Sequence, residues 1–407
     1  MSLSAPGACP PVLQPAVVNG SIVLPDYQGG GLFNLAVSVA RLCGADTPGD
    51  YADLSLPNVG NASNAWARHD SVVLFLVDGL GDEFLSRHRD MAPNLWRDRA
   101  TRLTSVFPST TATAITTLMT ARPASQHGLL GWFVRESHSG RLVAPLPMRY
   151  RNDGPVDDPE IVRRILSEPP TFGRARRQGH IVTLPYLAGG PYSAHHTGAA
   201  SVHPYADLAA LPQVVASVKA ACAAPHFIYC YTPLLDAMGH DHGTHSPEAL
   251  AALAQVDAAY AALRQALPDS LIVLTADHGF VDSPPERNVD LGTHSALHSM
   301  LAAPLSGEGR CAYCHVRPGM VAAFGEAAEA ALGRIMHVVP SAQLFDAGLF
   351  GPGEEQPARE RAGDWALIGR DDWTVYDRLP GERRHPMLGV HGGLSPAEMY
   401  VPLVLSA

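Results

Sequence analysis

Aspartate residues follow three apolar segments of the chain, and histidines stand close to two of them. The segments are short and rich in β-branched residues, as strands buried on both faces are. They are SVVLFLV (71–77) with Asp78 next, FIYCYTP (227–233) with Asp236 three residues on, and LIVLTA (271–276) with Asp277 next. One aspartate after a strand is usually a turn former, but three at equivalent positions need another explanation. If the strands are parallel and adjacent, all three meet at one edge of a sheet, where α/β folds bind ligands.

The histidines point to metal binding. His240 follows Asp236 by four residues, one helical turn, so both side chains can face one ion. His278 directly follows Asp277, and the HGG sequence at 391–393 adds His391 between small residues. Carboxylate oxygen and imidazole nitrogen suit zinc, with manganese and iron as alternatives. Two carboxylate–histidine sets predict two metal ions, an arrangement that supports phosphoryl transfer.

A run of hydroxyl residues could supply the nucleophile for such chemistry. The sequence SVFPSTTATA occupies residues 105–114 between two apolar segments. A coordinated cation lowers the pKa of a hydroxyl, which a serine or threonine nucleophile needs at neutral pH. The residues alone leave five candidates, which are Ser105, Ser109, Thr110, Thr111 and Thr113.

The elements that must position these side chains alternate between strand and helix. A fourth strand is expected over 180–187, and helices are expected over 31–42, roughly 205–222, and 246–268. The last of these has Ser246 to cap it, followed by an apolar stripe at three- and four-residue steps. This alternation predicts an α/β fold with a mostly parallel central sheet and helices on both faces.

Two stretches break the alternation, and we interpret them as segments inserted on the sheet. They are residues 135–178 and the loop-rich residues 281–385, and both could cap a substrate site. The whole chain, 1–407, is then a single catalytic domain. The basic run RYR at 149–151 is interpreted as part of a solvated charged face, with binding of an anionic substrate tail as the alternative. The Cys311–Cys314 pair is interpreted as loop thiols without a role, with half a zinc site or a redox pair as alternatives.

Composition limits the partners. Hydrophobic residues make up 46% of the 407 residues and the formal net charge is −10, so no nucleic-acid polymer is expected as a partner. The N-terminus has no basic and apolar pattern of a signal peptide, and no apolar run reaches the length of a membrane span. We therefore expect a cytoplasmic protein without a membrane partner; its oligomeric state is not predicted.

The order of motifs resembles the alkaline phosphatase superfamily, and most closely its type I phosphodiesterase/nucleotide pyrophosphatase family. The motifs are VDGL (77–80), FPSTTATAITTLMTARPASQHG (107–128), DAMGH (236–240), ADHG (276–279) and HGG (391–393). The resemblance covers roughly residues 71–280 and the last motif. It implies an alkaline phosphatase-like fold and hydrolysis of a small phosphate ester or anhydride with two divalent ions, most often Zn²⁺.

The resemblance also implies a role for each site residue. The family's spacing from Phe107 and from His127 selects Thr111 as the nucleophile, which would form a phosphothreonine intermediate. One ion would be bound by Asp78, Asp277, His278 and the Thr111 hydroxyl. The other would be bound by Asp236, His240 and His391.

Two departures from the family pattern concern the substrate. Ala112, Thr113 and Ala114 stand where the nucleotide pyrophosphatases have Phe-Pro-Asn, which removes an aromatic residue that would stack on a base. Trp132 stands near the position of the family's asparagine; we expect it to line the substrate pocket, with a packed aromatic as the alternative. A phosphomonoesterase and a phosphonate hydrolase are alternatives with the same site, and a non-catalytic metal-binding descendant is a third.

Overall fold

Seven strands form the central sheet of this computed structural model, which describes residues 8–48, 50–57, 59–222, 225–353, 356–382 and 387–406. The strand order is β4-β20-β11-β3-β10-β8-β9. Their bounds are β3 Ser71–Val77, β4 Arg99–Thr104, β8 Gln178–Thr183, β9 Ser201–Pro204, β10 His226–Thr232, β11 Leu271–Thr275 and β20 Tyr400–Ser406. Only β20 runs antiparallel to its neighbours, β4 and β11. The mostly parallel sheet expected from the sequence is therefore confirmed.

The register of the three central strands brings the aspartates to one edge. Strands β10 and β11 both pair in parallel with β3, with Thr232 opposite Val77 and Thr275 opposite Leu76. Every residue of β3 and β11 is buried. A strand buried on both faces shows no alternation of polar residues, which explains why these segments are continuously apolar.

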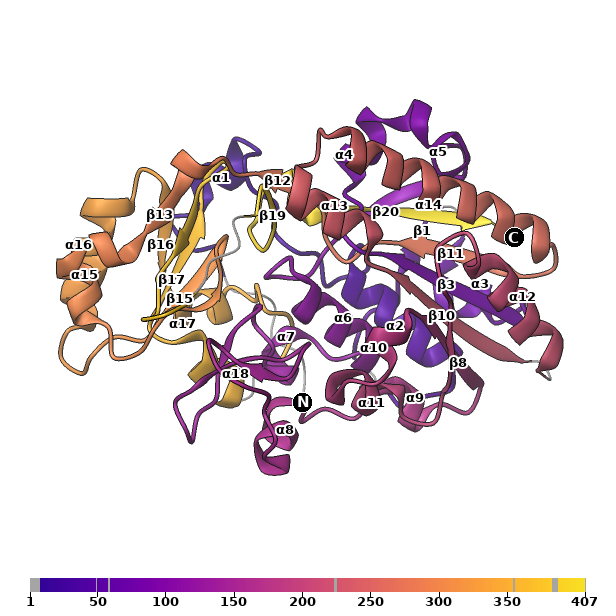
Figure 1. Cartoon of the computed structure of the whole chain (residues 1–407), viewed down its shortest axis with the longest axis horizontal. Coiled ribbons are helices and arrows are strands. Elements are labelled where there is room, and N and C mark those ends of the chain that lie inside the picture. The colour runs from indigo at the N-terminus through magenta and orange to yellow at the C-terminus, as the bar shows by residue number, and fades with distance from the viewer. Residues whose placement is uncertain are drawn as a thin grey trace.

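Helices cover both faces of the sheet (Figure 1). Helices α12 (Leu211–Ala221), α13 (Leu234–His242) and α14 (Pro247–Ala266) pack together on one face, and α2 (Leu32–Leu42) and α6 (Thr111–Thr120) pack together on the other. The Ser246 hydroxyl accepts a hydrogen bond from Ala249 N–H and caps α14 as expected. The strand predicted over 180–187 ends at Thr183, because Pro185 begins the short helix α10 (Pro185–Ala188).

The segment 281–385 contains a second sheet, so its description as loop-rich was wrong. Four antiparallel strands lie in the order β14 (Ser306–Glu308), β15 (Cys311–Cys314), β17 (Trp365–Gly369) and β16 (Met336–Pro340). Helices α15 (Ser295–Met300) and α16 (Val321–Leu332) pack beside it, in the orange part of Figure 1. Strands of three to five residues are too short to show a periodic pattern. Residues 354–355 and 383–385 of this segment lie outside the described residues.

The two cysteines of the CAYC sequence are buried in β15, so the interpretation as loop thiols was also wrong. Cys311 packs in one apolar cluster of the second sheet and Cys314 in another. Burial raises the pKa of both thiols, which keeps them protonated and poorly reactive.

The segment 135–178 folds into a small sheet and two short helices. The elements are β5 (Val134–Arg135), β6 (Leu142–Ala144), β7 (Arg149–Tyr150), α8 (Pro159–Ile165) and α9 (Thr171–Arg174). Arg151 does not belong to a solvated face, because its side chain is 7% exposed and pairs with Asp377 at 2.8 Å and Glu382 at 2.8 Å. This arginine ties the two predicted insertions together. Among the described helices, none combines the length and the hydropathy that a membrane crossing requires.

Candidate metal centre

Asp78 emerges from the end of β3 and faces the neighbouring strands. Its backbone N–H donates to the Thr232 carbonyl at 3.0 Å, which continues the pairing of β3 with β10. Its Oδ2 accepts a hydrogen bond from the Tyr231 hydroxyl. Its Oδ1 lies 3.3 Å from Nε2 of His278. The strand end therefore fixes one oxygen of the carboxylate and directs the other toward the histidine.

Asp277 and His278 follow β11 after Ala276 and are fully buried. Oδ1 of Asp277 accepts hydrogen bonds from the backbone N–H groups of Gly79, at 3.1 Å, and of His278, at 3.0 Å. The other oxygen, Oδ2, lies 3.4 Å from His278 Nε2. His278 Nδ1 lies 3.1 Å from the Gly279 carbonyl and donates to it, so Nε2 is the ring nitrogen that faces the carboxylates.

Thr111 is the hydroxyl of the 105–114 run that lies against His278. It begins α6, and its Oγ1 lies 3.0 Å from His278 Nε2. Three of the other candidates donate to backbone carbonyl groups: Ser105 to Asp277, Ser109 to Gly393 at 2.7 Å, and Thr113 to Leu129 at 2.8 Å. These three hold loops together, whereas Thr111 points into the cluster.

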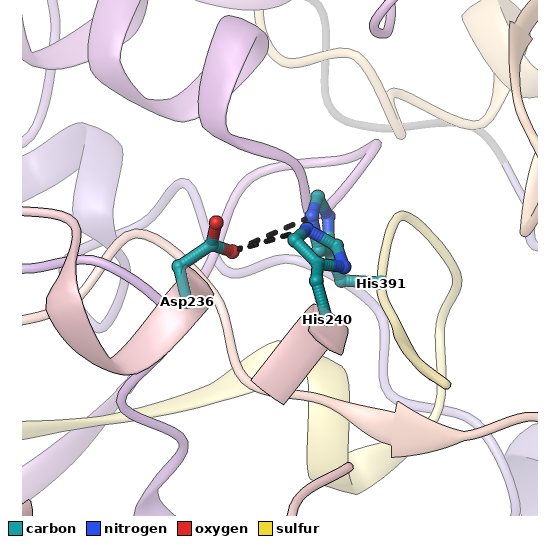
Figure 2. Close-up of side chains that lie close together, drawn as sticks. All are labelled: Asp236, His240 and His391. Carbon is teal, nitrogen blue, oxygen red and sulfur yellow. Dashed lines mark ion pairs between the residues drawn. The ribbon is translucent and has the colours of Figure 1, made fainter. Parts of the chain in front are cut away.

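The second set of predicted ligands lies beside the first (Figure 2). Asp236 and His240 are on α13, and His391 follows β19 (Gly389–Val390), which pairs with β12 (Val281–Asp282). Asp236 Oδ1 lies 3.4 Å from His240 Nε2 and 3.8 Å from His391 Nε2. His240 donates from Nδ1 to the Gly389 carbonyl at 2.8 Å, so its Nε2 is free to face Asp236.

The two predicted sets adjoin at Asp236, which belongs to the second set and also lies within reach of the first. Asp236, His240 and His391 form one group whose ligand atoms lie within 4.8 Å of one another, and Asp78, Asp236 and His278 form another. The rings of His278 and His391 are stacked with centroids 3.7 Å apart. The structure therefore brings the seven residues named from the sequence into one continuous cluster.

The buried titratable groups of the cluster have strongly shifted pKa values. Burial and the Asp78 carboxylate raise the pKa of Asp277 to about 8, and the same two causes raise the pKa of Asp236 well above its usual value. Burial lowers the pKa of His278, but the Asp277 and Asp78 carboxylates outweigh it and raise that pKa to about 10. Burial and the neighbouring His278 hold the pKa of His391 well below its usual range. Carboxylates that repel one another in a buried place favour a cation between them.

The donor set fits divalent ions. Oδ1 of Asp78, Oδ1 of Asp236 and Oδ2 of Asp277 are buried without a hydrogen-bond partner among the described residues. Buried carboxylate oxygens are normally paired or bound to metals. Together with the Nε2 atoms of His240, His278 and His391, which must be deprotonated to bind an ion, these oxygens provide the nitrogen and oxygen ligands that zinc takes.

An apolar cavity of about 110 Å³ opens beside Thr111. Its walls come from α6, β8, β9, β10, α10 and α11 (Pro191–Thr197), and they include Ile115, Leu187, Tyr192, Tyr229 and Tyr231. The described residues that line it include no lysine or arginine. Its one histidine, His196, is neutral, because burial lowers its pKa to about 3.

Sequence reasoning missed two residues of this region. Tyr231, which bonds Asp78, shares one face of β10 with Tyr229, and the two-residue spacing in FIYCYT was a usable signal. Glu308, which approaches His391, is a lone glutamate in the second sheet and had no motif around it. Trp132 is 40% exposed and is not among the residues that line the cavity beside Thr111; its role in substrate binding stays a prediction.

Solved structures of other proteins share this fold. Murine ectonucleotide pyrophosphatase/phosphodiesterase 5, an inactive threonine-to-alanine variant in complex with AMP, aligns with a TM-score of 0.61 and 18% identity over 82% of this chain and 87% of that one. The human protein aligns with a TM-score of 0.61 and 17% identity, also over 82% and 87%. Phosphonoacetate hydrolase from Sinorhizobium meliloti 1021, in complex with phosphonoacetate, aligns with a TM-score of 0.60 and 19% identity over 83% and 90%.

The sequence identifies the family to which the chain belongs. The profile of the type I phosphodiesterase/nucleotide pyrophosphatase family matches residues 72–394, and the chain belongs to that family. The family expected from the five motifs is therefore confirmed, and it is a family of hydrolases. No curated protein sequence matches the chain significantly.

Proposed function

We propose that the protein is a two-metal hydrolase of phosphodiesters or phosphoanhydrides with Thr111 as the nucleophile. The observation that carries the proposal is the position of the Thr111 hydroxyl, 3.0 Å from His278 Nε2 at the edge of the carboxylate–histidine cluster. Asp78, Asp277, His278 and Thr111 would hold one ion, and Asp236, His240 and His391 the other. Zinc is the expected metal, with manganese and iron as alternatives.

The reaction would proceed in two displacements at phosphorus. Bound divalent cations would supply charge to lower the pKa of the Thr111 hydroxyl and to offset the phosphoryl oxygens. Oγ1 of Thr111 would lose its proton to solvent and form a bond to phosphorus while the bond to the leaving oxygen breaks. Water would then cleave the phosphothreonine and restore the hydroxyl. An alanine in place of a threonine is named as inactive in the murine relative, which supports a threonine-dependent reaction.

The apolar cavity supports an ester with a neutral arm. A phosphodiester carries two substituents, and the cavity beside Thr111 offers tyrosine rings and aliphatic side chains to one of them. A hydrolase that acts on a phosphonate, as the Sinorhizobium structure with phosphonoacetate suggests, is the second candidate. A second anionic group would need a cationic partner, and the described residues that line this cavity provide none, which favours the diester.

The proposal is tested with bis-p-nitrophenyl phosphate, p-nitrophenyl phosphate and a Thr111→Ala protein. We expect the substitution to reduce turnover about 10³-fold or more while both metal ions remain bound. Thr113→Ala is the control, because that hydroxyl belongs to the same helix and bonds the Leu129 carbonyl; its turnover should stay close to wild type. Full activity of Thr111→Ala would sink the assignment.

Further measurements separate the alternatives. Chelation should abolish turnover, and metal content without turnover on a broad panel of phosphate and sulfate esters would favour a non-catalytic descendant. A higher rate on the monoester than on the diester would favour a phosphomonoesterase. The single catalytic domain with capping segments 135–178 and 281–385, and the location in the cytoplasm, stay predictions.

A further inference from the structure

Glu308 ends β14 in the second sheet and lies against the third ligand of the proposed second ion. Its Oε2 is 3.4 Å from Nδ1 of His391. Both side chains are shielded from water, with exposed fractions of 12% for Glu308 and 7% for His391. A hydrogen bond from an imidazole N–H to a carboxylate in such a place is stronger than at the surface, since little water competes for it.

The two nitrogens of His391 face different carboxylates. Nε2 faces Asp236 Oδ1 at 3.8 Å, and Nδ1 faces Glu308 Oε2 at 3.4 Å. A histidine that binds a metal through one nitrogen commonly donates its other N–H to a carboxylate, which fixes the tautomer and the direction of the ring. His391 Nδ1 has no hydrogen-bond partner among the described residues, and Oε2 of Glu308, 3.4 Å away, is a carboxylate oxygen within reach of it.

The close packing of Glu308 explains a glycine of the HGG motif. Gly392 has a φ of +112°, which favours glycine, and a Cβ there would lie 2.7 Å from the Glu308 carboxyl carbon. The Glu308 side chain, where it lies, leaves no room for a Cβ at residue 392.

The hairpin formed by β14 and β15 contacts the loop at residues 391–393 at a second point. Arg310, in the turn between β14 and β15, pairs with Glu398 at 2.8 Å and 3.0 Å, and both side chains are fully buried. Glu398 in turn accepts a hydrogen bond from Gly393 N–H at 2.8 Å. The β14–β15 hairpin thus holds both the ring of His391 and the backbone next to it.

We propose that Glu308 is a positioning residue that orients His391 for metal binding, so that the second sheet completes the metal centre on the first. The inference rests on the proposed function, which assigns His391 as a ligand. It adds a residue that no motif of the sequence includes. It also gives the segment 281–385 a role in the metal site besides covering substrate.

The test measures metal affinity directly. Stoichiometry and dissociation constants are obtained by titrating the metal-free protein with Zn²⁺ against a chromogenic chelator, and the absorption spectrum of the Co²⁺-loaded protein reports ligand geometry. Glu308→Ala should reduce the affinity for one of the two ions about 10- to 100-fold and change the Co²⁺ spectrum. Glu308→Gln keeps the shape and one acceptor oxygen, so it should recover part of the loss.

Glu136→Gln is the matched control. Its carboxylate is also largely buried, with 2% of the side chain exposed, and it pairs with Arg164 and His138 rather than with a proposed ligand. Unchanged affinity for both ions in Glu308→Ala, or an equal loss in Glu136→Gln, overturns the role of Glu308. A wild-type protein that binds fewer than two ions overturns the proposed function and this inference with it.

Discussion

The Tyr231 hydroxyl donates a hydrogen bond to Oδ2 of Asp78 across the neighbouring strands β10 and β3. The bond occupies one oxygen of this carboxylate and leaves Oδ1 directed at His278, 3.3 Å from its Nε2. Tyrosine therefore does for Asp78 what backbone N–H groups do for Asp277: each fixes the carboxylate through one oxygen and leaves the other for the cluster.

Removing this hydroxyl should weaken metal binding. For Tyr231→Phe we expect an affinity for one divalent ion about 10-fold or more below wild type, because partners of a ligand fix its orientation. Tyr229→Phe is the control, since Tyr229 lies on the same strand and its buried hydroxyl has no hydrogen-bond partner among the described residues. Zinc titration of both variants checks the prediction, and equal affinities in the two would contradict it.

The buried pair of Arg310 and Glu398 should be important for stability. Arg310→Met leaves the Glu398 carboxylate buried without its cation, and we expect the free energy of unfolding to fall by about 3–5 kcal/mol. Arg163→Met is the control, because Arg163 forms an exposed pair with Glu160 and should cost less than about 1 kcal/mol. Urea denaturation at pH 7 measures both; similar losses in the two variants would argue against a structural role for the buried pair.

His127, the histidine of the H-G motif, should make the protein sensitive to acid. Its Nδ1 accepts from Leu129 N–H at 3.1 Å, and its Nε2 lies 3.0 Å from the Thr117 hydroxyl, so the neutral ring suits its place. Burial and the nearby His196 lower the pKa of His127 to about 3. The folded pKa lies below the unfolded value near 6.5, so stability is full above that value and is lost as pH falls toward 3.

The size of this effect can be measured by denaturation at two pH values. A histidine that is protonated only in the unfolded state lowers the free energy of unfolding by about 2 kcal/mol between pH 7 and pH 5. His127→Asn keeps an acceptor near Leu129 N–H but does not titrate. Its free energy of unfolding should therefore fall by about 2 kcal/mol less between pH 7 and pH 5 than that of the wild type. Identical pH dependence in the two proteins would show that His127 does not titrate on unfolding.

The parts of the fold that could be predicted are those whose signal lies within one segment. Residues 71–77 and 271–276 are continuous apolar runs. Parallel pairing of the two strands is enough to bring Asp78 and Asp277, which follow them, close together. The family spacing around Thr111 also lies within one stretch of chain, and the structure directs this hydroxyl at His278.

The parts that could not be predicted depend on contacts between distant segments. Glu308 approaches His391 because two loops pack at Gly392, and no local pattern encodes that packing. Arg151 reads as a surface charge in RYR, and only the fold places Asp377 and Glu382 around it. Strands as short as β14 carry too few residues to establish a period.

The cavity beside Thr111 predicts which substrates a mutation will affect. Ala188 is in α10 and lines this cavity, so Ala188→Phe should fill the space that an aromatic arm would occupy. We expect kcat/KM for bis-p-nitrophenyl phosphate to fall about 10-fold, the equivalent of about 1.4 kcal/mol of lost contact. For methyl p-nitrophenyl phosphate, whose second substituent is a methyl group, kcat/KM should change less than about twofold.

The control for this experiment places the same ring elsewhere. Ala251→Phe adds a phenylalanine to the exposed side of α14, away from the residues that line the cavity, and both substrates should keep their rates. If Ala188→Phe reduced kcat/KM for both esters equally, the phenylalanine ring would disturb the whole metal centre. The second substituent of the ester would then not occupy this cavity. A selective loss on the diaryl ester would place its second substituent between α10 and the tyrosines of β10, in the cavity whose described lining residues include no lysine or arginine.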